Sequence, residues 1–246
     1  MSRSEQVTTE VAVSQAPQIR QEPFARACYA VVAVLGLIAL GLSIRNGIIG
    51  PSTVPDGAGY SHVFPAGWPN VLNQFMYFTF MSNLLVVIAA AWLAIKPRTN
   101  SELLRVLNIC ALVCIMVTGI VFNFLLRNDD PMSPLKRFHD TIQHIFTPIV
   151  FPLLWLIFGP IGRVVWRRIA WSTVIPLAWL VTTLVRGELL DWYPYSILDV
   201  PKLGYGPVLA YVAGILVLYF VLATALWGID RARSRRTEHL IRERSV

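Results

Sequence analysis

Two side chains that could serve as a nucleophile and its base stand inside long apolar stretches of this sequence. His144 lies about one helical turn into the apolar segment 142–158, and Thr79 lies near the start of the apolar segment 75–95. An ionisable side chain is costly in hydrocarbon and is usually functional when it occurs there. A hydroxyl and an imidazole at one depth can form a nucleophile and a general base. The alternative is that the histidine reaches water or headgroups at the interface.

The elements that must position these residues are membrane spans. The chain has 246 residues, 55% hydrophobic and 14% charged, with a mean hydropathy of +0.58, and its apolar residues form long blocks. Such blocks are typical of a polytopic membrane protein. We therefore predict an all-α fold with six transmembrane helices. The predicted spans are residues 27–44, 75–95, 103–126, 142–158, 169–185 and 208–229.

The distribution of positive charge orients these spans. The N-terminal arm, the second and fourth loops and the C-terminal tail carry 15 of the 21 lysines and arginines, and the other loops carry six. The positive-inside rule then places both termini in the cytoplasm. A basic tail after a last span normally meets anionic lipid headgroups. The net charge of +7 therefore predicts membrane lipids, and not nucleic acid, as partners.

The flanks and the cysteines add little chemistry. Residues 1–25 have too few apolar side chains to fold alone and predict a disordered cytoplasmic arm. Residues 26–229 form the six-helix domain, and residues 230–246 form a basic cytoplasmic tail. The first apolar run is long enough to act as a signal anchor. Cys28, Cys110 and Cys114 lie inside spans without metal-binding spacing, so we predict neither a disulfide nor a metal or cofactor site.

The topology places Thr79 and His144 at similar depth. The second and fourth spans both begin on the outer side, so each residue lies about one turn below the outer interface. Pro148 and Pro152 each remove one helical hydrogen bond, and the carbonyl that Pro148 sets free belongs to His144. A kink there would open space beside the imidazole and leave an acceptor. Prolines are also frequent in ordinary spans.

Further polar residues gather at the same level and are candidates for the oxyanion or substrate-binding site: Ser82, Asn83, Asn123 and Arg186. Ser82 and Asn83 share one helical face with Thr79, because residues three and four apart stack above one another. Ser82 is thus a rival nucleophile. The alternative is that Thr, Ser and Asn join helices through hydrogen bonds and close packing.

The external loops carry acids and aromatic residues. The first loop is rich in Pro and Gly and can fold over the outer mouth of the bundle. In the fifth loop, Glu188, Asp191 or Asp199 could orient an imidazole or pair with an arginine. Its aromatic residues fit an interfacial belt. His139, beside Asp140, is expected in the third external loop and solvated.

Three motifs in order carry a family resemblance. They are Tyr-Phe-Thr79-Phe-Met-Ser82-Asn83-Leu, His144 followed by Pro148 and by Leu-Leu-Trp155-Leu-Ile-Phe, and Trp192-Tyr-Pro194-Tyr-Ser-Ile-Leu-Asp199. Over residues 26–228 the chain resembles the androgen-induced, ADTRP-like membrane proteins, and their bacterial branch most. The resemblance therefore implies a multi-pass protein of the bacterial cell membrane, and the topology predicted from charge places its site near the external face.

The resemblance also implies an activity. Animal members of that family are threonine hydrolases that cleave fatty acid esters of hydroxy fatty acids with a Thr and a His. Carried over, this implies Thr79 as nucleophile, His144 as general base, and a lipid-like acyl ester as substrate. The chain differs from the animal members in its arm, its longer first loop and its basic tail.

Two other classes of function are compatible with the sequence. Six spans divide into two three-span halves of opposite orientation, as in many transporters, although the halves show no sequence repeat. A small-solute or lipid transporter, or a lipid-binding protein without catalysis, is therefore the alternative. A structural or partner-binding membrane subunit is a third, and it predicts that Thr79 and His144 affect stability only.

Overall fold

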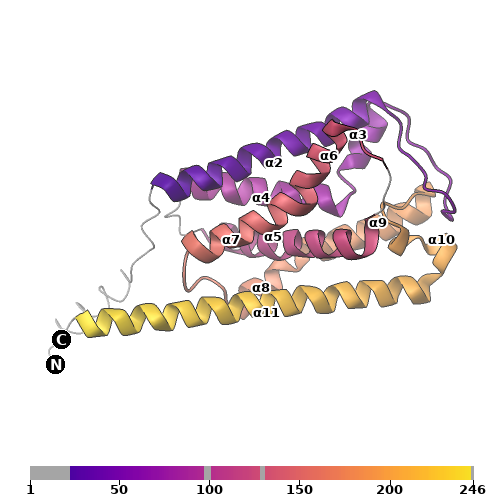
Figure 1. The fold of residues 1–246 in the computed structure, drawn as a ribbon. Helices are drawn as coiled ribbons and strands as arrows, with labels where there is room; N and C mark the ends of the chain where they lie inside the picture. Colours follow the sequence, from indigo (N-terminus) through magenta and orange to yellow (C-terminus); the bar gives the residue numbers. More distant parts are fainter. Residues whose placement is uncertain (1–22, 97–100, 128–130, 245–246) are drawn as a thin grey trace.

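The protein is a bundle of six membrane-length helical segments. The computed structural model describes residues 23–96, 101–127 and 131–244, with side chains up to residue 239, and within them it contains helices but no strands (Figure 1). Six segments are long and apolar enough to cross a membrane. They are Pro23–Ile49, Phe78–Ile95, Glu102–Leu126, Pro134–Phe158, Trp166–Leu190 and Tyr205–His239. The prediction of an all-α, six-span membrane protein is confirmed.

Several spans are assembled from shorter helices. The elements are α2 (Pro23–Ile49), α3 (Trp68–Gln74), α4 (Phe78–Ile95), α5 (Glu102–Val121), η1 (Phe122–Leu126), α6 (Pro134–Thr141), η2 (Ile142–Phe146), α7 (Thr147–Phe158), α8 (Trp166–Ser172), α9 (Val174–Leu190), η3 (Ser196–Leu198), α10 (Val200–Leu203) and α11 (Tyr205–Arg244). Both η1 and η2 are π-helical, whereas η3 is a 3-10 helix. The π-helical turns lie where the third span ends and within the fourth.

The fourth span begins earlier than the sequence predicted, at Pro134 and not at residue 142. Ser133 caps the helix by accepting a hydrogen bond from the Lys136 N–H, and proline suits the first helical turn. The polar residues of this turn concealed the helix from a reading by hydropathy. His139 was predicted in a solvated loop, and this is wrong: it lies in α6, where its Nε2 is 2.8 Å from Ser43 Oγ.

The predicted flanks differ in part from the structure. Most of the predicted arm, residues 1–25, falls outside the described residues, and α2 already begins at Pro23. The predicted tail, from residue 230, continues α11 as a helix to Arg244. Helix α11 therefore extends beyond the bundle, as Figure 1 shows.

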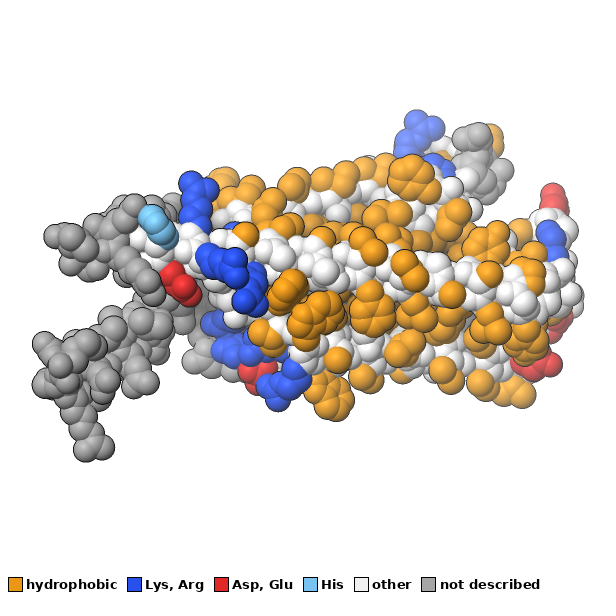
Figure 2. Space-filling model, turned by 90° about the horizontal axis from the view of Figure 1, so that it is seen from below, with side chains coloured by type: hydrophobic (Ala, Val, Ile, Leu, Met, Phe, Trp, Pro, Cys, Tyr) orange, Lys and Arg blue, Asp and Glu red, His pale blue; other side chains and the backbone are white. Residues whose placement is uncertain are grey.

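The two ends of the bundle differ in what they carry. The first residue of α2 and the last turns of α11 lie at one end, which we call the terminal end, while α3, α10 and the loops before α4 and α11 lie at the other, the site end (Figure 1). Figure 2 shows the face that α11 forms: hydrophobic side chains cover its middle, and most of the visible Lys and Arg lie toward the terminal end, with a smaller number at the site end. A lipid-facing surface has this distribution.

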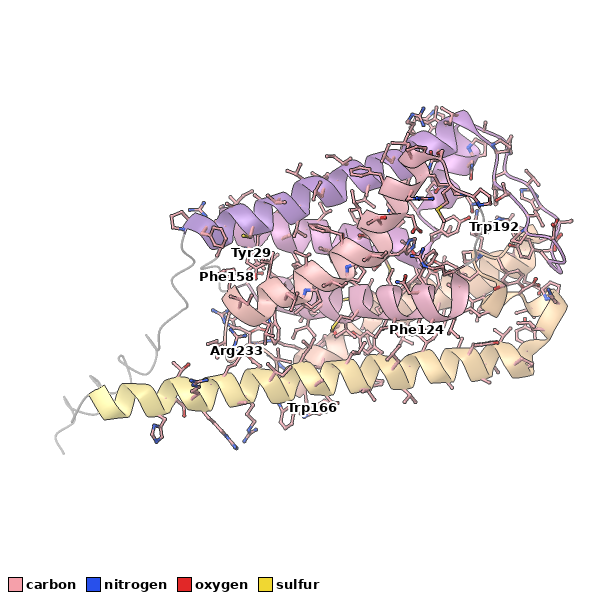
Figure 3. All side chains as sticks on the ribbon, viewed as in Figure 1. Tyr29, Phe124, Phe158, Trp166, Trp192 and Arg233 are labelled. Carbon is pink, nitrogen blue, oxygen red and sulfur yellow. The ribbon has the colours of Figure 1, made fainter. Side chains whose placement is uncertain are left out.

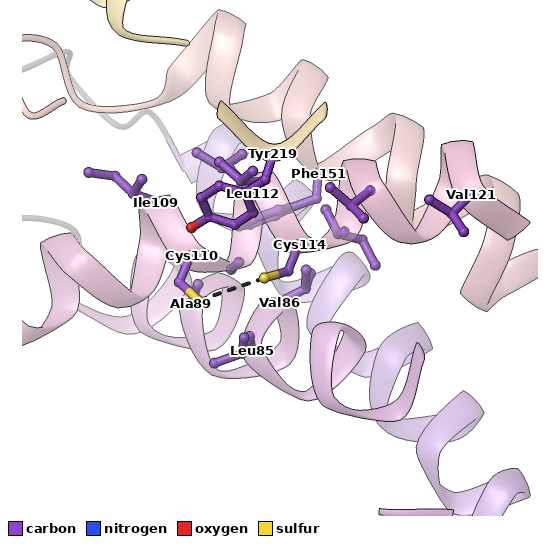
Figure 4. Packing of buried hydrophobic residues seen from close by; sticks show 14 of the residues in the cluster. Leu85, Val86, Ala89, Ile109, Cys110, Leu112, Cys114, Val121, Phe151 and Tyr219 are labelled. Atoms are coloured by element: carbon purple, nitrogen blue, oxygen red, sulfur yellow. Dashed lines mark hydrogen bonds between the residues drawn. The ribbon is translucent and has the colours of Figure 1, made fainter. Parts of the chain in front are cut away.

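Helix α5 forms the centre of the core. Residues 109–115 are at most 2% exposed, and they pack against Val86 and Ala89 of α4, Phe151 of α7 and Tyr219 of α11 (Figure 4). The free thiols of Cys110 and Cys114 lie one turn apart on this helix, with their sulfurs 3.8 Å from each other. A helix buried on all sides is apolar all round, as this part of the sequence is.

Helices α9 and α11 are packed more loosely than the others. In the most apolar 18-residue stretch of each of these two spans, 17% of the residues are buried, against 39–56% in the corresponding stretches of the other four spans. Along their described lengths these two helices hardly touch each other. Most of their surface therefore faces lipid, and the space between them is not filled by a tight helix interface.

At the terminal end, α11 is fixed to the loop after α7. Asp230 accepts hydrogen bonds from the N–H groups of Gly162 and Val164. Arg233 donates to the carbonyls of Trp155 and Gly159, which end α7, and stacks on the Trp155 ring (Figure 3). Because helix C-termini leave carbonyls without partners, the arginine caps α7.

At the site end, the loop 50–67 is fixed to the loop that follows α9. Asp199 accepts from the Gly59 N–H, and Asp191 accepts from both the N–H and the hydroxyl of Ser61. Trp192 packs on the Phe64 ring between these loops (Figure 3). The two loops thus stabilise each other over this end of the bundle.

The Asp191 carboxylate gives a pH-dependent contribution to stability. Hydrogen bonds from Ser61 lower the pKa of Asp191 below its usual value. The ionised carboxylate therefore stabilises the fold at pH values above the usual aspartate pKa. This stabilisation is lost as the pH falls through the lower pKa that Asp191 has in the folded protein. Asp191 has a left-handed backbone conformation, with φ of 49°, and asparagine tolerates this conformation, so a substitution by asparagine removes the charge without straining the backbone. We expect Asp191→Asn to lower the melting temperature near neutral pH.

The difference between Asp191→Asn and the natural chain should shrink as the pH is lowered through the acid range, because both side chains are then uncharged. Thermal unfolding of both proteins in detergent, over a series of pH values, measures this difference. A difference in melting temperature that stays constant over that series would contradict the assignment.

Candidate active site

Thr79 and His144 face each other at the site end of the bundle. Thr79 lies in the first turn of α4, and His144 lies in the π-helical turn η2. Thr79 Oγ1 is 3.3 Å from His144 Nε2, and each residue is 9% exposed. The two segments are 65 residues apart in sequence, and the fold brings the hydroxyl within hydrogen-bond distance of the imidazole. This is the arrangement of a hydroxyl and its general base.

Asp140 lies on the other side of the imidazole. Its Oδ1 is 2.8 Å from His144 Nδ1, one helical turn away, and its Oδ2 is 3.3 Å from an Arg127 guanidinium nitrogen. A carboxylate only accepts hydrogen bonds, so the Nδ1 of a neutral His144 carries the ring proton. Nε2 is then an acceptor, and it faces Thr79 Oγ1. Hydroxyl, imidazole and carboxylate form one chain of hydrogen bonds.

Two further residues fix the imidazole ring. Phe122 of η1 is stacked on His144, with ring centroids 3.4 Å apart and an angle of 7° between the planes. The Arg127 guanidinium lies over the Phe122 ring, 5.1 Å from its centroid, and also reaches Asp140. A ring that is stacked on one neighbour and hydrogen-bonded at both nitrogens has little rotational freedom. The imidazole is therefore held in one orientation toward Thr79.

The π-helical turn of His144 depends on Pro148 and its neighbours. Because Pro148 has no N–H, the His144 carbonyl lacks the usual helical hydrogen bond from the residue four positions later, as the sequence indicates. That carbonyl accepts a hydrogen bond of 2.8 Å from Asn123 Nδ2, which also donates to the Gly119 carbonyl. A side chain at position 119 would come within 2.6 Å of Pro148 Cβ, so glycine lets the two helices approach. π-helical turns of this kind are frequent at functional sites.

The predicted oxyanion candidates of α4 hold the backbone around Thr79. Asn83 donates to the carbonyls of Thr79 and Gln143, at 2.9 and 3.4 Å. Ser82 Oγ donates to the Thr79 carbonyl and lies 2.7 Å from Thr118 Oγ1. Both side chains are fully buried. The Asn83 and Asn123 amides therefore each donate to one carbonyl of their own span and to one of the fourth span, which positions Thr79 and His144.

The other predicted polar residues lie around the loops. Arg186 stacks on the rings of Phe64 and Trp192, with its guanidinium carbon 4.7 and 5.2 Å from their centroids. Asp191 and Asp199 accept from the loop 50–67, as described above, and Glu188 is exposed. The carboxylate beside the imidazole is Asp140 and none of these three. If the predicted fourth span had been extended by one turn toward the N-terminus, Asp140 and His144 would have been recognised as residues four apart on one helical face.

Tyr195 is a site residue that the sequence did not single out. Its hydroxyl accepts a hydrogen bond of 3.1 Å from the Thr79 N–H and lies 3.3 Å from Thr79 Oγ1. Burial raises the pKa of Tyr195 above its usual value, so its phenol stays protonated at neutral pH. Its proton can then be donated to an oxygen beside Thr79. The aromatic character of the fifth loop suggested an interfacial belt and concealed this role.

An apolar pocket of about 90 Å³ opens beside Thr79 and Tyr195. It lies among α5, α9 and α11, where the last two helices hardly touch. Apolar side chains make up most of its wall: Phe78, Val117, Val121, Leu177, Leu180, Val212, Ile215 and Leu216. Among the residues that the structure describes, no group of three or more His, Cys, Asp or Glu could hold a metal ion.

Comparisons of this chain with models of known protein families, with curated proteins and with solved structures find no match.

Proposed function

We propose that this protein is a membrane-embedded carboxylic ester hydrolase in which Thr79 is the nucleophile and His144 the general base. The observation that carries the proposal is the hydrogen-bonded chain Asp140–His144–Thr79 beside an apolar pocket. Hydroxyl, imidazole and carboxylate in this order are the parts of a nucleophilic hydrolase. The resemblance to the ADTRP-like threonine hydrolases supports the same assignment to Thr79 and His144.

The first half of the reaction forms an acyl-enzyme. His144 Nε2 takes the proton of the Thr79 hydroxyl as Oγ1 attacks the ester carbonyl carbon, and Asp140 stabilises the imidazolium that forms. The tetrahedral intermediate collapses when its bond to the alcohol oxygen breaks. His144 gives its proton to that oxygen, and the alcohol leaves. The product of this half is an ester between the acyl group and Thr79.

The second half repeats the proton transfers with water. His144 Nε2 takes a proton from a water molecule, whose oxygen attacks the carbonyl carbon of the acyl-threonine. The bond between that carbon and Thr79 Oγ1 then breaks, and Oγ1 recovers its proton from His144. A carboxylic acid is released and the site returns to its starting state.

Negative charge on the carbonyl oxygen requires a hydrogen-bond donor, and Tyr195 is the best placed. Its hydroxyl lies 3.3 Å from Thr79 Oγ1, where the reacting carbonyl must come. Loss of one such donor costs about 10²- to 10³-fold in kcat in other hydrolases. We expect this loss in kcat for Tyr195→Phe, with a smaller change in KM, in assays of purified protein. Tyr193→Phe, two residues away, is the matched control, and equal kcat values in both variants would refute the role.

The pocket indicates a lipid-like ester as substrate. Its wall is apolar, and it lies at membrane depth between two loosely packed helices. An ester with a fatty acyl chain can place its carbonyl at Thr79 and its chain in the pocket. Such a substrate dissolves in the bilayer, so access from the side between α9 and α11 suits it better than access from water. The charge distribution of the sequence would place this site in the outer leaflet.

The direct test is hydrolysis by the purified protein. We expect p-nitrophenyl esters of fatty acids in mixed micelles to release p-nitrophenol, and an alkyl fluorophosphonate to stop the release. Product formation also separates this function from transport, the alternative compatible with the sequence. Uptake of an ester into proteoliposomes, with no acid or alcohol formed, would overturn the hydrolase assignment.

A further inference from the structure

We propose that the apolar pocket is a binding site for a single acyl chain and that Tyr219, at its far end, sets the longest chain that fits. This inference rests on the proposed hydrolase function for its assay. It concerns a residue that has no part in the chemistry at Thr79. Three features of the pocket carry it: its depth, its wall and its floor.

The depth follows from the helix register of the lining residues. On α5 and η1 they run from Leu126, near the site end, to Val117, and on α11 they run from Val212 to Tyr219. At 1.5 Å per helical residue, these runs extend about 10–13 Å along the helix axes. One lipid tail spans about 15 Å, half of a hydrocarbon core. The pocket is therefore shorter than one full-length lipid tail.

The wall offers an acyl chain no free polar group along its length. The hydroxyl of Thr118 is hydrogen-bonded to Ser82, and that of Thr173 donates to the Ala170 carbonyl. Trp179 Nε1 donates to the Met76 carbonyl. Because these groups already have partners within the protein, the wall presents carbon atoms to a ligand. The polar groups with a role toward a ligand, Thr79 and Tyr195, lie nearer to the site end of the bundle than Tyr219 does.

The floor is a rigid aromatic side chain. Tyr219 is 3% exposed and lies in the core against α5, as Figure 4 shows. Its hydroxyl is 2.7 Å from Ser172 Oγ, which in turn donates to the Ile169 carbonyl. Ring packing and this hydrogen bond hold Tyr219 at both ends. A chain that reaches the ring cannot extend further without displacing it, which is how a fixed floor selects chain length.

The experiment compares hydrolysis of p-nitrophenyl esters from butyrate to stearate. For the natural chain, kcat/KM should rise with acyl length, reach a maximum and fall for the longest acids. Removal of the ring in Tyr219→Ala should move the maximum to longer acids, and raise kcat/KM for palmitate relative to octanoate about tenfold, the effect of two more buried methylenes. Tyr219→Phe keeps the floor and should leave the profile unchanged.

Two more variants make the test independent of the folding of Tyr219→Ala. Leu216→Trp fills the pocket one helical turn nearer to Thr79 and should move the maximum to shorter acids. Tyr211→Ala is the matched control, because Tyr211 lies on the same helix, is 40% exposed and does not line the pocket. If Tyr219→Ala, Leu216→Trp and Tyr211→Ala all hydrolyse the esters with the same dependence of kcat/KM on acyl length as the natural chain, the proposal is overturned.

A binding measurement separates this inference from the proposed hydrolysis. Saturated fatty acids of increasing length should raise the melting temperature of the natural chain up to a limiting length, and Tyr219→Ala should extend that limit. If no ester is hydrolysed but this pattern appears, the hydrolase assignment fails and the acyl site stands. If esters are hydrolysed and the fatty acids stabilise both proteins alike at every length, the floor assigned to Tyr219 is wrong.

Discussion

Thr79→Val should abolish ester hydrolysis and leave the helical bundle intact. Valine has nearly the shape of threonine, with a methyl group in place of the hydroxyl, so the first turn of α4 keeps its packing. The nucleophile is lost, and we expect kcat to fall by at least about 10⁴-fold, as when a catalytic hydroxyl is removed elsewhere. Thr79→Ser keeps a hydroxyl 3.3 Å from His144 Nε2 and should remain active.

Ser82 supplies the control for this prediction. It lies on the same face of α4 as Thr79, but its hydroxyl pairs with Thr118 and with the Thr79 carbonyl. Ser82→Ala should therefore lower stability by about 1–3 kcal/mol, because it leaves a buried partner unpaired, while hydrolysis continues. Initial rates and thermal unfolding of the three variants give both quantities. Full activity in Thr79→Val with none in Ser82→Ala would transfer the nucleophile to Ser82.

His144→Ala should lower kcat by about 10³- to 10⁴-fold or more, because no other base lies within hydrogen-bond distance of Thr79 among the described residues. Asp140→Asn should have the next largest effect, about 10²- to 10⁴-fold, because an amide at 2.8 Å can donate to Nδ1 and favour the wrong tautomer. Steady-state kinetics with a p-nitrophenyl ester measure both losses.

His139 provides a matched control for His144. It lies five residues away in the same span, is paired with Ser43 at 2.8 Å, and has no contact with Thr79. His139→Gln should keep most of the activity. Equal losses of activity in His139→Gln and His144→Ala, together with equal losses in melting temperature, would indicate a role in stability only. The assignment of a general base would then be wrong.

The spans and the similar depth of Thr79 and His144 could be predicted from the sequence for a physical reason. Apolar runs of sufficient length must cross the bilayer, and spans that begin on one side place their first turns at one depth. The depth of a residue along the membrane normal can thus be predicted from the sequence. The distance between Thr79 Oγ1 and His144 Nε2 is not, because it depends on the rotation and packing of two helices.

Asp140 and Tyr195 were missed for different reasons. Asp140 lies in the second turn of α6, at the polar start of the fourth span, which hydropathy assigns to the loop although Ser133 caps it as a helix. Tyr195 comes from a loop whose path over the site depends on hydrogen bonds that Asp191 and Asp199 accept from a segment 130 to 140 residues away in the chain. Contacts of this kind are set by the tertiary fold and leave no periodic signal in the sequence.

The carbonyl oxygen of His144 is another group whose partner could not be predicted from the sequence. The sequence identified the His144 carbonyl as the group that Pro148 leaves without a helical partner. The sequence predicts that this carbonyl remains an open acceptor beside the imidazole. In the structure Asn123 of η1 donates to it at 2.8 Å. A buried acceptor in a membrane bundle needs a partner, and the neighbouring helix supplies one.

The most direct test of the central claim is to identify the residue that an alkyl fluorophosphonate modifies. The purified protein is treated with the probe and digested, and the labelled peptide is sequenced by mass spectrometry. We predict one adduct, on the hydroxyl of Thr79, formed more slowly in His144→Ala and in Asp140→Asn. An adduct on Ser82 or on any other residue, or active protein without an adduct on Thr79, would contradict it.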